Sequence, residues 1–197
     1  MHRTQPGHVN SALLIVDMIS DFLFPEGEAL VRQARSIVKP ISLLAARFRR
    51  SGWPVVYVND NFGQWHLSFP ELVRWVQRGE SLGREIAAAI APVDSDYFIL
   101  KPRHSAFYET ALPSLLRTLD THRLALVGLA GDACVLATAM DAHMREMAVW
   151  IPADATASLT QQRNRRALDF LHESMQCDIR TVSQFLSELR HDELTNI

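Results

Sequence analysis

The chain contains little cysteine and no long hydrophobic run. Cys134 and Cys177 are the two cysteines among 197 residues, which argues against the disulfide framework of a small secreted domain. No stretch of about 20 residues is apolar enough to span a bilayer, and residues 1–8 lack the apolar core of a signal peptide. We therefore expect a cytoplasmic protein whose cysteines are free for chemistry.

Blocks of like charge are also missing. The formal net charge is -2, and neither acidic nor basic residues form a long run, so the sequence predicts no nucleic-acid partner and no membrane partner. The partner that we expect is a small molecule. Because 48% of the residues are hydrophobic, the chain can bury a full core. We expect a single domain over residues 1–197, in which residues 1–10 form a flexible N-terminus.

Short apolar or β-branched runs alternate along the chain with longer helical patterns. Six runs are expected strands, at residues 12–17, 55–59, 97–100, 124–128, 148–151 and 179–182. Seven patterns are expected helices, at residues 36–50, 70–78, 81–91, 112–119, 133–145, 160–174 and 183–189. Continuous apolar strands separated by helices are typical of parallel sheets covered on both faces. The sequence thus predicts an α/β fold, a three-layer α/β/α sandwich with a six-stranded, mainly parallel sheet.

Three reactive side chains lie at the ends of expected strands. Asp17 and Lys101 each end or follow an apolar run, and Cys134 follows another at the start of a helix. Ligands of open α/β sheets bind outside the carboxyl ends of the strands, where such groups can meet. A helix N-terminus and a nearby ammonium both favour a thiolate, so we expect a lowered pKa at Cys134 and nucleophilic catalysis. Taken singly, each residue has a structural alternative: a helix cap, a solvated surface lysine or an inert core cysteine.

Three motifs carry a resemblance to a known family. They are residues 14–22 (LIVDMISDF), 98–107 (FILKPRHSAF) and 128–135 (GLAGDACV). In this order they resemble the isochorismatase-like cysteine hydrolases, a superfamily that includes nicotinamidases, carbamoylsarcosine amidohydrolases and ureido-acid hydrolases. The resemblance implies a Rossmann-type fold, a catalytic triad of Asp17, Lys101 and Cys134, and a homodimer or homotetramer. It also implies a cis peptide bond between Leu129 and Ala130.

The resemblance implies a cysteine mechanism. Cys134 attacks a carbonyl carbon, Lys101 holds positive charge beside the sulfur, and Asp17 accepts the thiol proton and later gives it to the leaving amine. The backbone N–H groups of Ala130 and Cys134 would form the oxyanion hole. Water then hydrolyses the thioester. Cys177, which precedes an expected strand, is interpreted as a small buried apolar residue.

The pocket is less well defined by the sequence. Loops held by a rigid scaffold concentrate binding residues, and the residues that we expect to bind substrate are Phe22, Asn61, Phe62, Trp65 and Phe107. For the aromatic side chains a place in the core is the alternative. Whether Asp21, His104 and Tyr108 take part stays open: Asp21 fits a cap or the pocket, and His104 fits a pocket donor or a structural residue.

One departure from the family bears on metal. Nicotinamidases of this superfamily bind a divalent metal through an Asp-x-His pattern, but residues 60–62 read DNF, which leaves Asp60 and His66 as a poor ligand set. We therefore expect no metal and no other cofactor, and a hydrolase of an amide, ureido or carbamoyl C–N bond. A nucleophilic cysteine also argues against vinyl-ether hydrolysis, the isochorismatase reaction. The alternatives are a nicotinamidase-type metal-assisted amidase, a thiol redox enzyme, and a non-catalytic binding domain on the same fold.

Overall fold

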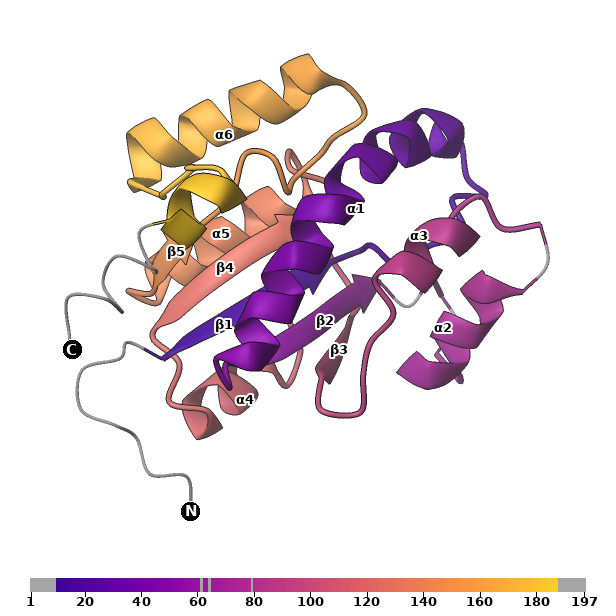
Figure 1. Cartoon of the computed structure of the whole chain (residues 1–197), viewed down its shortest axis with the longest axis horizontal. Coiled ribbons are helices and arrows are strands. Elements are labelled where there is room, and N and C mark those ends of the chain that lie inside the picture. Colours follow the sequence, from indigo (N-terminus) through magenta and orange to yellow (C-terminus); the bar gives the residue numbers. More distant parts are fainter. Residues whose placement is uncertain (1–9, 61, 64, 79, 188–197) are drawn as a thin grey trace.

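A parallel sheet forms the centre of the molecule (Figure 1). The computed structural model describes residues 10–60, 62–63, 65–78 and 80–187. Five strands make the sheet, in the order β3-β2-β1-β4-β5, and every neighbouring pair is parallel. They are β1 (Ser11–Val16), β2 (Val55–Asp60), β3 (Tyr97–Lys101), β4 (Arg123–Gly128) and β5 (Ala148–Trp150).

Helices cover both faces of this sheet (Figure 1). They are α1 (Gly27–Arg50), α2 (Phe69–Gln77), α3 (Arg84–Ala89), α4 (Leu112–Thr118), α5 (Cys134–Met144) and α6 (Gln161–Met175). All six residues of β1 are buried because it is the middle strand, and its side chains alternate between two cores. Leu13 and Ile15 pack in the core under α1 and α3, whereas Leu14 and Val16 pack under α4, α5 and α6. The predicted α/β/α sandwich is confirmed.

The sixth predicted strand is wrong. Asp178 forms an isolated bridge with Trp150, but the chain then turns away and residues 182–187 are helical. Thr181 begins this turn, since its backbone N–H and its hydroxyl both contact the Gln184 side chain at 2.9 Å. A short run such as residues 179–182 forms a strand only where a neighbouring strand can pair with it. Here the contacts of Thr181 with Gln184 favour the start of a helix instead. The rest of the helix expected at residues 183–189 lies outside the described residues.

Helix α1 begins nine residues before the start predicted at Ser36, so Pro40 lies inside the helix rather than in its first turn. An interior proline costs about 3 kcal/mol. The buried face runs on both sides of that proline, from Val31 through Ile37 to Phe48. Each fully buried side chain of this size contributes about 1.5 to 3 kcal/mol, so packing of the whole stripe offsets the proline.

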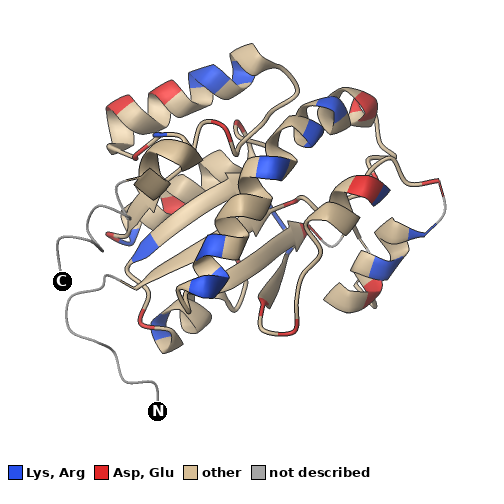
Figure 2. Ribbon diagram, in the orientation of Figure 1, with Lys and Arg blue, Asp and Glu red and all other residues tan. Residues whose placement is uncertain are grey.

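The surface carries mixed charge. Figure 2 shows basic and acidic residues spread over the helices, both signs occurring on α6. Within the described ranges, no helix combines the length and the apolar character that crossing a bilayer requires. The flexible N-terminus expected at residues 1–10 falls almost wholly on residues 1–9, which lie outside the described part of the chain.

Candidate active site

Asp17 lies directly after β1, in a left-handed backbone conformation with φ 49°. Its backbone N–H donates to the Val58 carbonyl at 2.8 Å, and its side-chain Oδ1 accepts the Asp60 backbone N–H at 2.8 Å. Aspartate tolerates positive φ better than most residues do. The turn therefore fixes the carboxylate at the carboxyl end of β1, beside β2. A non-glycine residue with positive φ is often found at a functional site.

Lys101 is the last residue of β3, and its ammonium reaches the same carboxylate. Its Nζ lies 2.9 Å from Asp17 Oδ2 and 4.0 Å from Asp60 Oδ2, and its side chain is 0% exposed. Burial by itself lowers a lysine pKa and is the largest single effect here, but the charge and hydrogen bond of Asp17, together with the charges of Cys134 and Asp60, raise the pKa of Lys101 above its usual value. Lys101 is thus a buried group that is charged at neutral pH.

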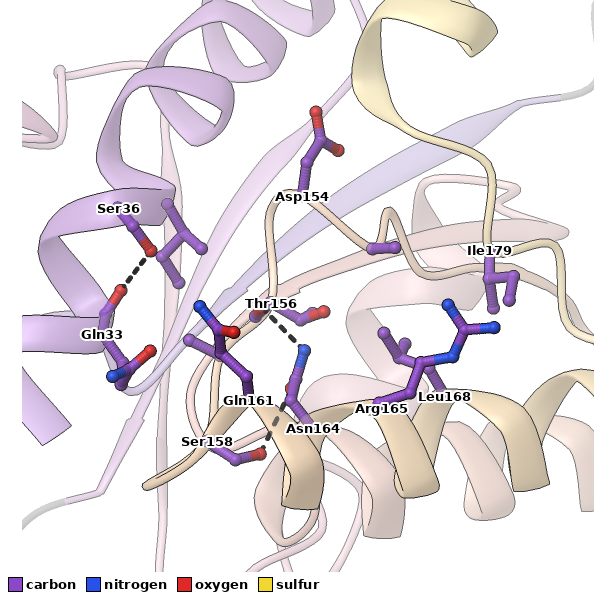
Figure 3. Close-up of a pocket in the computed structure, with 13 residues that line it drawn as sticks. Gln33, Ser36, Asp154, Thr156, Ser158, Gln161, Asn164, Arg165, Leu168 and Ile179 are labelled. Atoms are coloured by element: carbon purple, nitrogen blue, oxygen red, sulfur yellow. Dashed lines mark hydrogen bonds between the residues drawn. The ribbon is translucent and has the colours of Figure 1, made fainter.

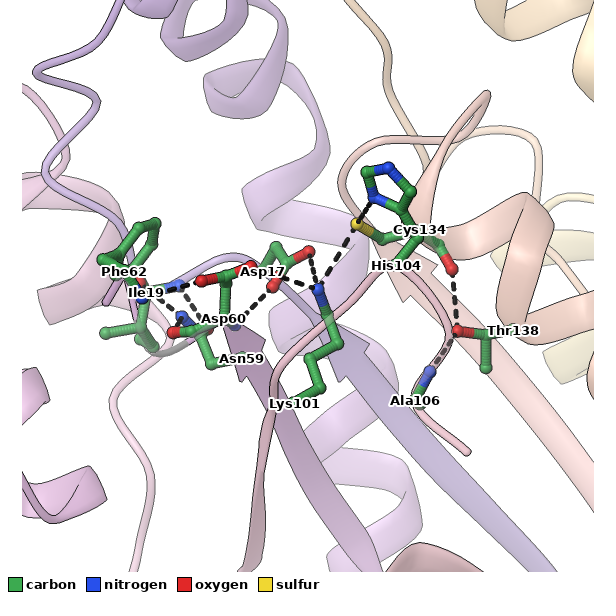
Figure 4. A network of polar contacts seen from close by, with 10 residues as sticks. All are labelled: Asp17, Ile19, Asn59, Asp60, Phe62, Lys101, His104, Ala106, Cys134 and Thr138. Carbon is green, nitrogen blue, oxygen red and sulfur yellow. Dashed lines mark hydrogen bonds and ion pairs between the residues drawn. The ribbon is translucent and has the colours of Figure 1, made fainter. Parts of the chain in front are cut away.

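Cys134 begins α5, at the end of the loop that follows β4. The Ala130 carbonyl accepts the backbone N–H groups of Ala133 and Val135 at 3.0 and 3.1 Å, which folds this loop into the first helical turn. Sγ of Cys134 lies 3.4 Å from Lys101 Nζ and 3.5 Å from His104 Nδ1. The structure therefore brings together the three side chains of the predicted triad (Figure 4).

Gly128 allows the ends of β1 and β4 to meet. It has φ 108°, a conformation that side-chain-bearing residues rarely adopt. A Cβ at this position would also collide with the Val16 carbonyl oxygen. The absence of a side chain therefore lets the loop that carries Cys134 start directly beside the turn that carries Asp17.

The sequence predicts a lowered pKa for the Cys134 thiol, and this prediction is wrong, because the pKa is raised. Burial raises the pKa of this thiol, and the negative charge of Asp17 raises it further, whereas Lys101 lowers it; the balance raises the pKa to about 12. The ammonium already has a carboxylate partner, so a thiolate would be an extra negative charge in the cluster. At rest the sulfur is therefore a neutral thiol held beside an ion pair.

The loop before α5 has two backbone donors free to bind an oxygen atom. Within the described residues, the N–H groups of Ala130 and Cys134 donate to no acceptor, as expected of an oxyanion hole. The predicted cis bond between Leu129 and Ala130 is wrong, because that bond is trans. Leu129 N–H donates to Val16 and Gly131 N–H to Ala157, at 2.9 and 2.8 Å. With this peptide bond trans, the N–H groups of Leu129 and Gly131 are both hydrogen-bonded, so the loop does not need a cis bond to satisfy them.

The residues predicted to bind substrate occupy different environments. Phe22 and Phe107 are buried in the two separate cores, at 1% and 4% exposure, and so take the core alternative. Phe62 is partly buried against Trp75, with ring centroids 6.3 Å apart, and Trp65 is 77% exposed. Asn61 lies outside the described residues.

The residues left open by the sequence are also placed. Asp21 Oδ1 accepts the Leu23 backbone N–H at 3.0 Å, which is a turn contact. Tyr108 is half exposed. His104 contacts the sulfur of Cys134, as the pocket interpretation requires.

The side chains do not fit a bound metal ion. Asp60 Oδ1 accepts the Phe62 backbone N–H at 2.7 Å, and Oδ2 lies 4.0 Å from Lys101 Nζ. In the described ranges no group of three or more His, Cys, Asp or Glu side chains is arranged to hold a metal ion. A catalytic zinc needs about three protein ligands. The carboxylate that a metal would use is already engaged by the protein.

Sequence reasoning considered Asp60 only as a metal ligand, not as a neighbour of Lys101, and it missed Thr138. Asp60 is the last residue of β2, just as Asp17 directly follows β1. Its position at the carboxyl end of a strand therefore could have predicted that it lies near Asp17. Thr138 lies one helical turn after Cys134 and is fully buried. Its Oγ1 donates to the Cys134 carbonyl at 2.7 Å and accepts the Ala106 N–H at 3.0 Å. The i, i+4 spacing predicts the first contact, but the second depends on the folded loop.

A separate cavity of about 520 Å³ lies between α1, α6 and the loop that follows β5 (Figure 3). Asn164 closes one side of it by donating to the Thr156 carbonyl at 3.1 Å and accepting the Ser158 hydroxyl at 3.2 Å. Neither the carboxylate, the ammonium nor the thiol of the cluster lines this cavity. The reactive groups described above lie instead at the carboxyl ends of the sheet strands.

The fold is a parallel sheet with helices on both faces, and a carboxylate, a lysine and a cysteine lie together at the carboxyl ends of its strands, an arrangement that suits a cysteine-type hydrolase. The model of the isochorismatase domain matches residues 11–184. The chain belongs to the isochorismatase family.

Relatives agree with this membership. The isochorismatase family protein YaaI of Bacillus subtilis (strain 168) is 41% identical over 91% of this chain and 98% of its own length. Ureidoacrylate amidohydrolase RutB of Serratia proteamaculans (strain 568) is 30% identical over 74% of this chain and 69% of its own. The crystal structure of N-carbamoylsarcosine amidase from Thermoplasma acidophilum superposes with a TM-score of 0.66, at 29% identity, over 88% of this chain and 96% of its own. The family therefore includes hydrolases that act on amides.

Proposed function

We propose that this protein hydrolyses the C–N bond of a small amide, ureido or carbamoyl compound through a thioester on Cys134. The observation that carries the proposal is the contact chain from Asp17 through Lys101 to the sulfur, at 2.9 and 3.4 Å. Two similar proteins, the ureidoacrylate amidohydrolase and the N-carbamoylsarcosine amidase, support the reaction class. Among the described residues the donors near Asp60 number fewer than the three ligands that a catalytic zinc needs, which supports a proposal without a metal.

The first half-reaction begins from the neutral thiol. As Sγ attacks the substrate carbonyl carbon, the thiol proton passes to the Asp17 carboxylate, since a free thiolate beside that carboxylate is unfavourable. Asp17 then gives the proton to the leaving nitrogen, the C–N bond breaks, and ammonia or an amine departs. A neutral thiol and a nearby base suit this concerted step better than a preformed thiolate does.

Lys101 and the backbone hold the charges in place. Because Lys101 is buried and paired with Asp17, it keeps the carboxylate oriented toward the cluster rather than toward solvent. The N–H groups of Ala130 and Cys134 receive the developing oxyanion, a contribution of about 3 kcal/mol per donor in other hydrolases. Phe62 and Trp65, near the end of β2, are the proposed apolar contacts of the substrate.

The test is a screen for ammonia release from the purified protein with small amides, ureido acids and carbamoyl compounds. Cys134→Ala is the blank, and Cys177→Ala, at a buried cysteine that does not contact Lys101 or Asp17, is the matched control. We expect at least one compound to be turned over by the wild type and by Cys177→Ala but not by Cys134→Ala. Equal turnover by the wild type and Cys134→Ala would contradict the nucleophile, and treatment with a chelator should leave the rate unchanged.

A further inference from the structure

His104 contacts the sulfur from the solvent side of the cluster. Its Nδ1 lies 3.5 Å from Cys134 Sγ, and the side chain is exposed. In Figure 4 the ring reaches the sulfur from the side away from Lys101 and Asp17. The sulfur therefore lies between a buried ammonium and an exposed imidazole.

This contact is built into the fold. The loop after β3 is tied to α5 because the Ala106 N–H donates to Thr138 Oγ1 at 3.0 Å, and that hydroxyl donates to the Cys134 carbonyl at 2.7 Å. Ser105, next to His104, donates through Oγ to Asp141 Oδ2 at 2.5 Å. These hydrogen bonds thus fix the position of the loop that carries the imidazole relative to the helix that carries the thiol.

Lys101 and Asp17 lie on the other side of the sulfur and are less exposed than His104. Asp17 Oδ1 accepts the Asp60 N–H at 2.8 Å, and Oδ2 pairs with Lys101 Nζ at 2.9 Å. The Lys101 side chain is 0% exposed, so it closes the inner side of the sulfur. The imidazole of His104 lies on a solvent-exposed side of the sulfur, from which water can reach a thioester on Cys134.

We propose that His104 is the catalytic base of the second half-reaction, thioester hydrolysis, while Asp17 serves the first; this inference rests on the proposed function. The water oxygen attacks the thioester carbonyl carbon, and one water proton passes to His104 Nδ1. The C–S bond breaks with its electron pair left on Sγ, which takes the proton back from Nδ1. The products are the free acid and the neutral Cys134 thiol, so atoms and charge balance.

The return of the proton explains why the imidazole contacts the sulfur rather than solvent alone. The thiol has a pKa of about 12, raised by burial and by Asp17, so a departing thiolate is unfavourable in this cluster. An imidazolium at 3.5 Å can protonate the sulfur as the bond breaks. The same nitrogen thus serves as base toward water and as acid toward sulfur.

The test uses p-nitrophenyl acetate, which forms an acetyl thioester whatever the natural substrate is. The wild type should release one equivalent of nitrophenol per chain in a burst and then turn over slowly. His104→Ala should keep the burst amplitude and rate, lose about 100-fold in the steady state, and accumulate acetylated protein by intact mass spectrometry. After the excess ester is removed, added imidazole should speed the loss of the acetyl group from this variant, followed by intact mass spectrometry.

The controls separate this inference from the proposed function. His122→Ala removes another exposed histidine, which pairs with Asp120 at 3.1 Å, and should behave as wild type. A burst that is slowed together with turnover, unchanged turnover, or no response to imidazole in His104→Ala would overturn the role of His104. A burst that is absent from the wild type or that survives in Cys134→Ala would instead refute the proposed nucleophile, and this inference with it.

Discussion

Replacing Asp17 with asparagine should change the reactivity of the sulfur and the hydrolytic rate in opposite directions. Asp17 Oδ2 and Cys134 Sγ both contact Lys101 Nζ, at 2.9 and 3.4 Å, so they lie at most about 6 Å apart. Two unit charges at about 6 Å interact by about 3 kcal/mol at an effective dielectric constant of about 20. Removal of the carboxylate charge should therefore lower the pKa of the thiol by about 2 units.

The direction of the change in the Cys134 pKa follows from the charges in the cluster. In the wild type the ammonium of Lys101 is neutralised by Asp17, and the pKa of Cys134 is raised to about 12. In Asp17→Asn the ammonium keeps the more distant Asp60 carboxylate, at 4.0 Å, and a thiolate at 3.4 Å then has one carboxylate fewer beside it. The thiolate fraction at pH 8 then rises by about 100-fold for a shift of about 2 units. Because intrinsic nucleophilicity falls with the pKa, by about tenfold here, the net gain in reactivity is about tenfold.

The assay follows the reaction of the thiol with an aromatic disulfide reagent at pH 8, in a Cys177→Ala background that leaves a single cysteine. Hydrolysis of the substrate found by the screen should fall in the same variant by at least about 100-fold, since the base of the first half-reaction is lost. Asp21→Asn is the matched control, because its carboxylate serves a turn contact with Leu23. Slower reaction of Asp17→Asn with the disulfide would refute the reasoning, since it would show that Asp17 promotes the resting thiolate.

Three further changes should affect stability in defined ways. Gly128→Ala should lower the free energy of unfolding in urea by more than about 1 kcal/mol, because φ is positive and the new Cβ meets the Val16 carbonyl; an unchanged midpoint would contradict this. Thr138→Val should cost about 1 to 3 kcal/mol in the same assay by leaving the buried Ala106 N–H unpaired, and no loss would contradict the anchor. Burial raises the pKa of Tyr57 to about 12, so the folded protein keeps this phenol proton where the unfolded chain loses it. Stability is then full below about pH 10 and falls by about 2 to 3 kcal/mol toward pH 12, a slope that Tyr57→Phe should remove.

The positions of the reactive groups were predictable because they depend on topology. Asp17 follows β1 and Lys101 ends β3, and parallel strands place their carboxyl ends at one edge whatever the details of packing. Cys134 needed only one more step, a short loop after β4 that leads into a helix. Three apolar runs with a polar residue after each were enough to place the cluster.

The element ends were less predictable because they depend on competing local and tertiary contacts. The start of α1 and the missing sixth strand are examples. Proline at position 40 favours a helix that starts nearby, but the buried stripe from Val31 to Phe48 extends the helix through it. Residues 179–182 have strand-like composition, but capping by Thr181 directs the chain into a helix.

The charge state of the sulfur depends on distances that no sequence contains. Helix position and a nearby lysine both favour a thiolate, yet the carboxylate lies so close to the ammonium that the two neutralise one another, and burial then favours the thiol. The Lys101 ammonium already lies 2.9 Å from the Asp17 carboxylate and 4.0 Å from the Asp60 carboxylate, so the cluster has no place for a further anion until a substrate carbonyl is polarised. Under the proposed mechanism the new negative charge therefore forms on the substrate oxygen, where the N–H groups of Ala130 and Cys134 receive it, while the thiol proton moves to Asp17. Under the proposed mechanism the raised pKa of Cys134 thus couples nucleophilic attack to substrate binding.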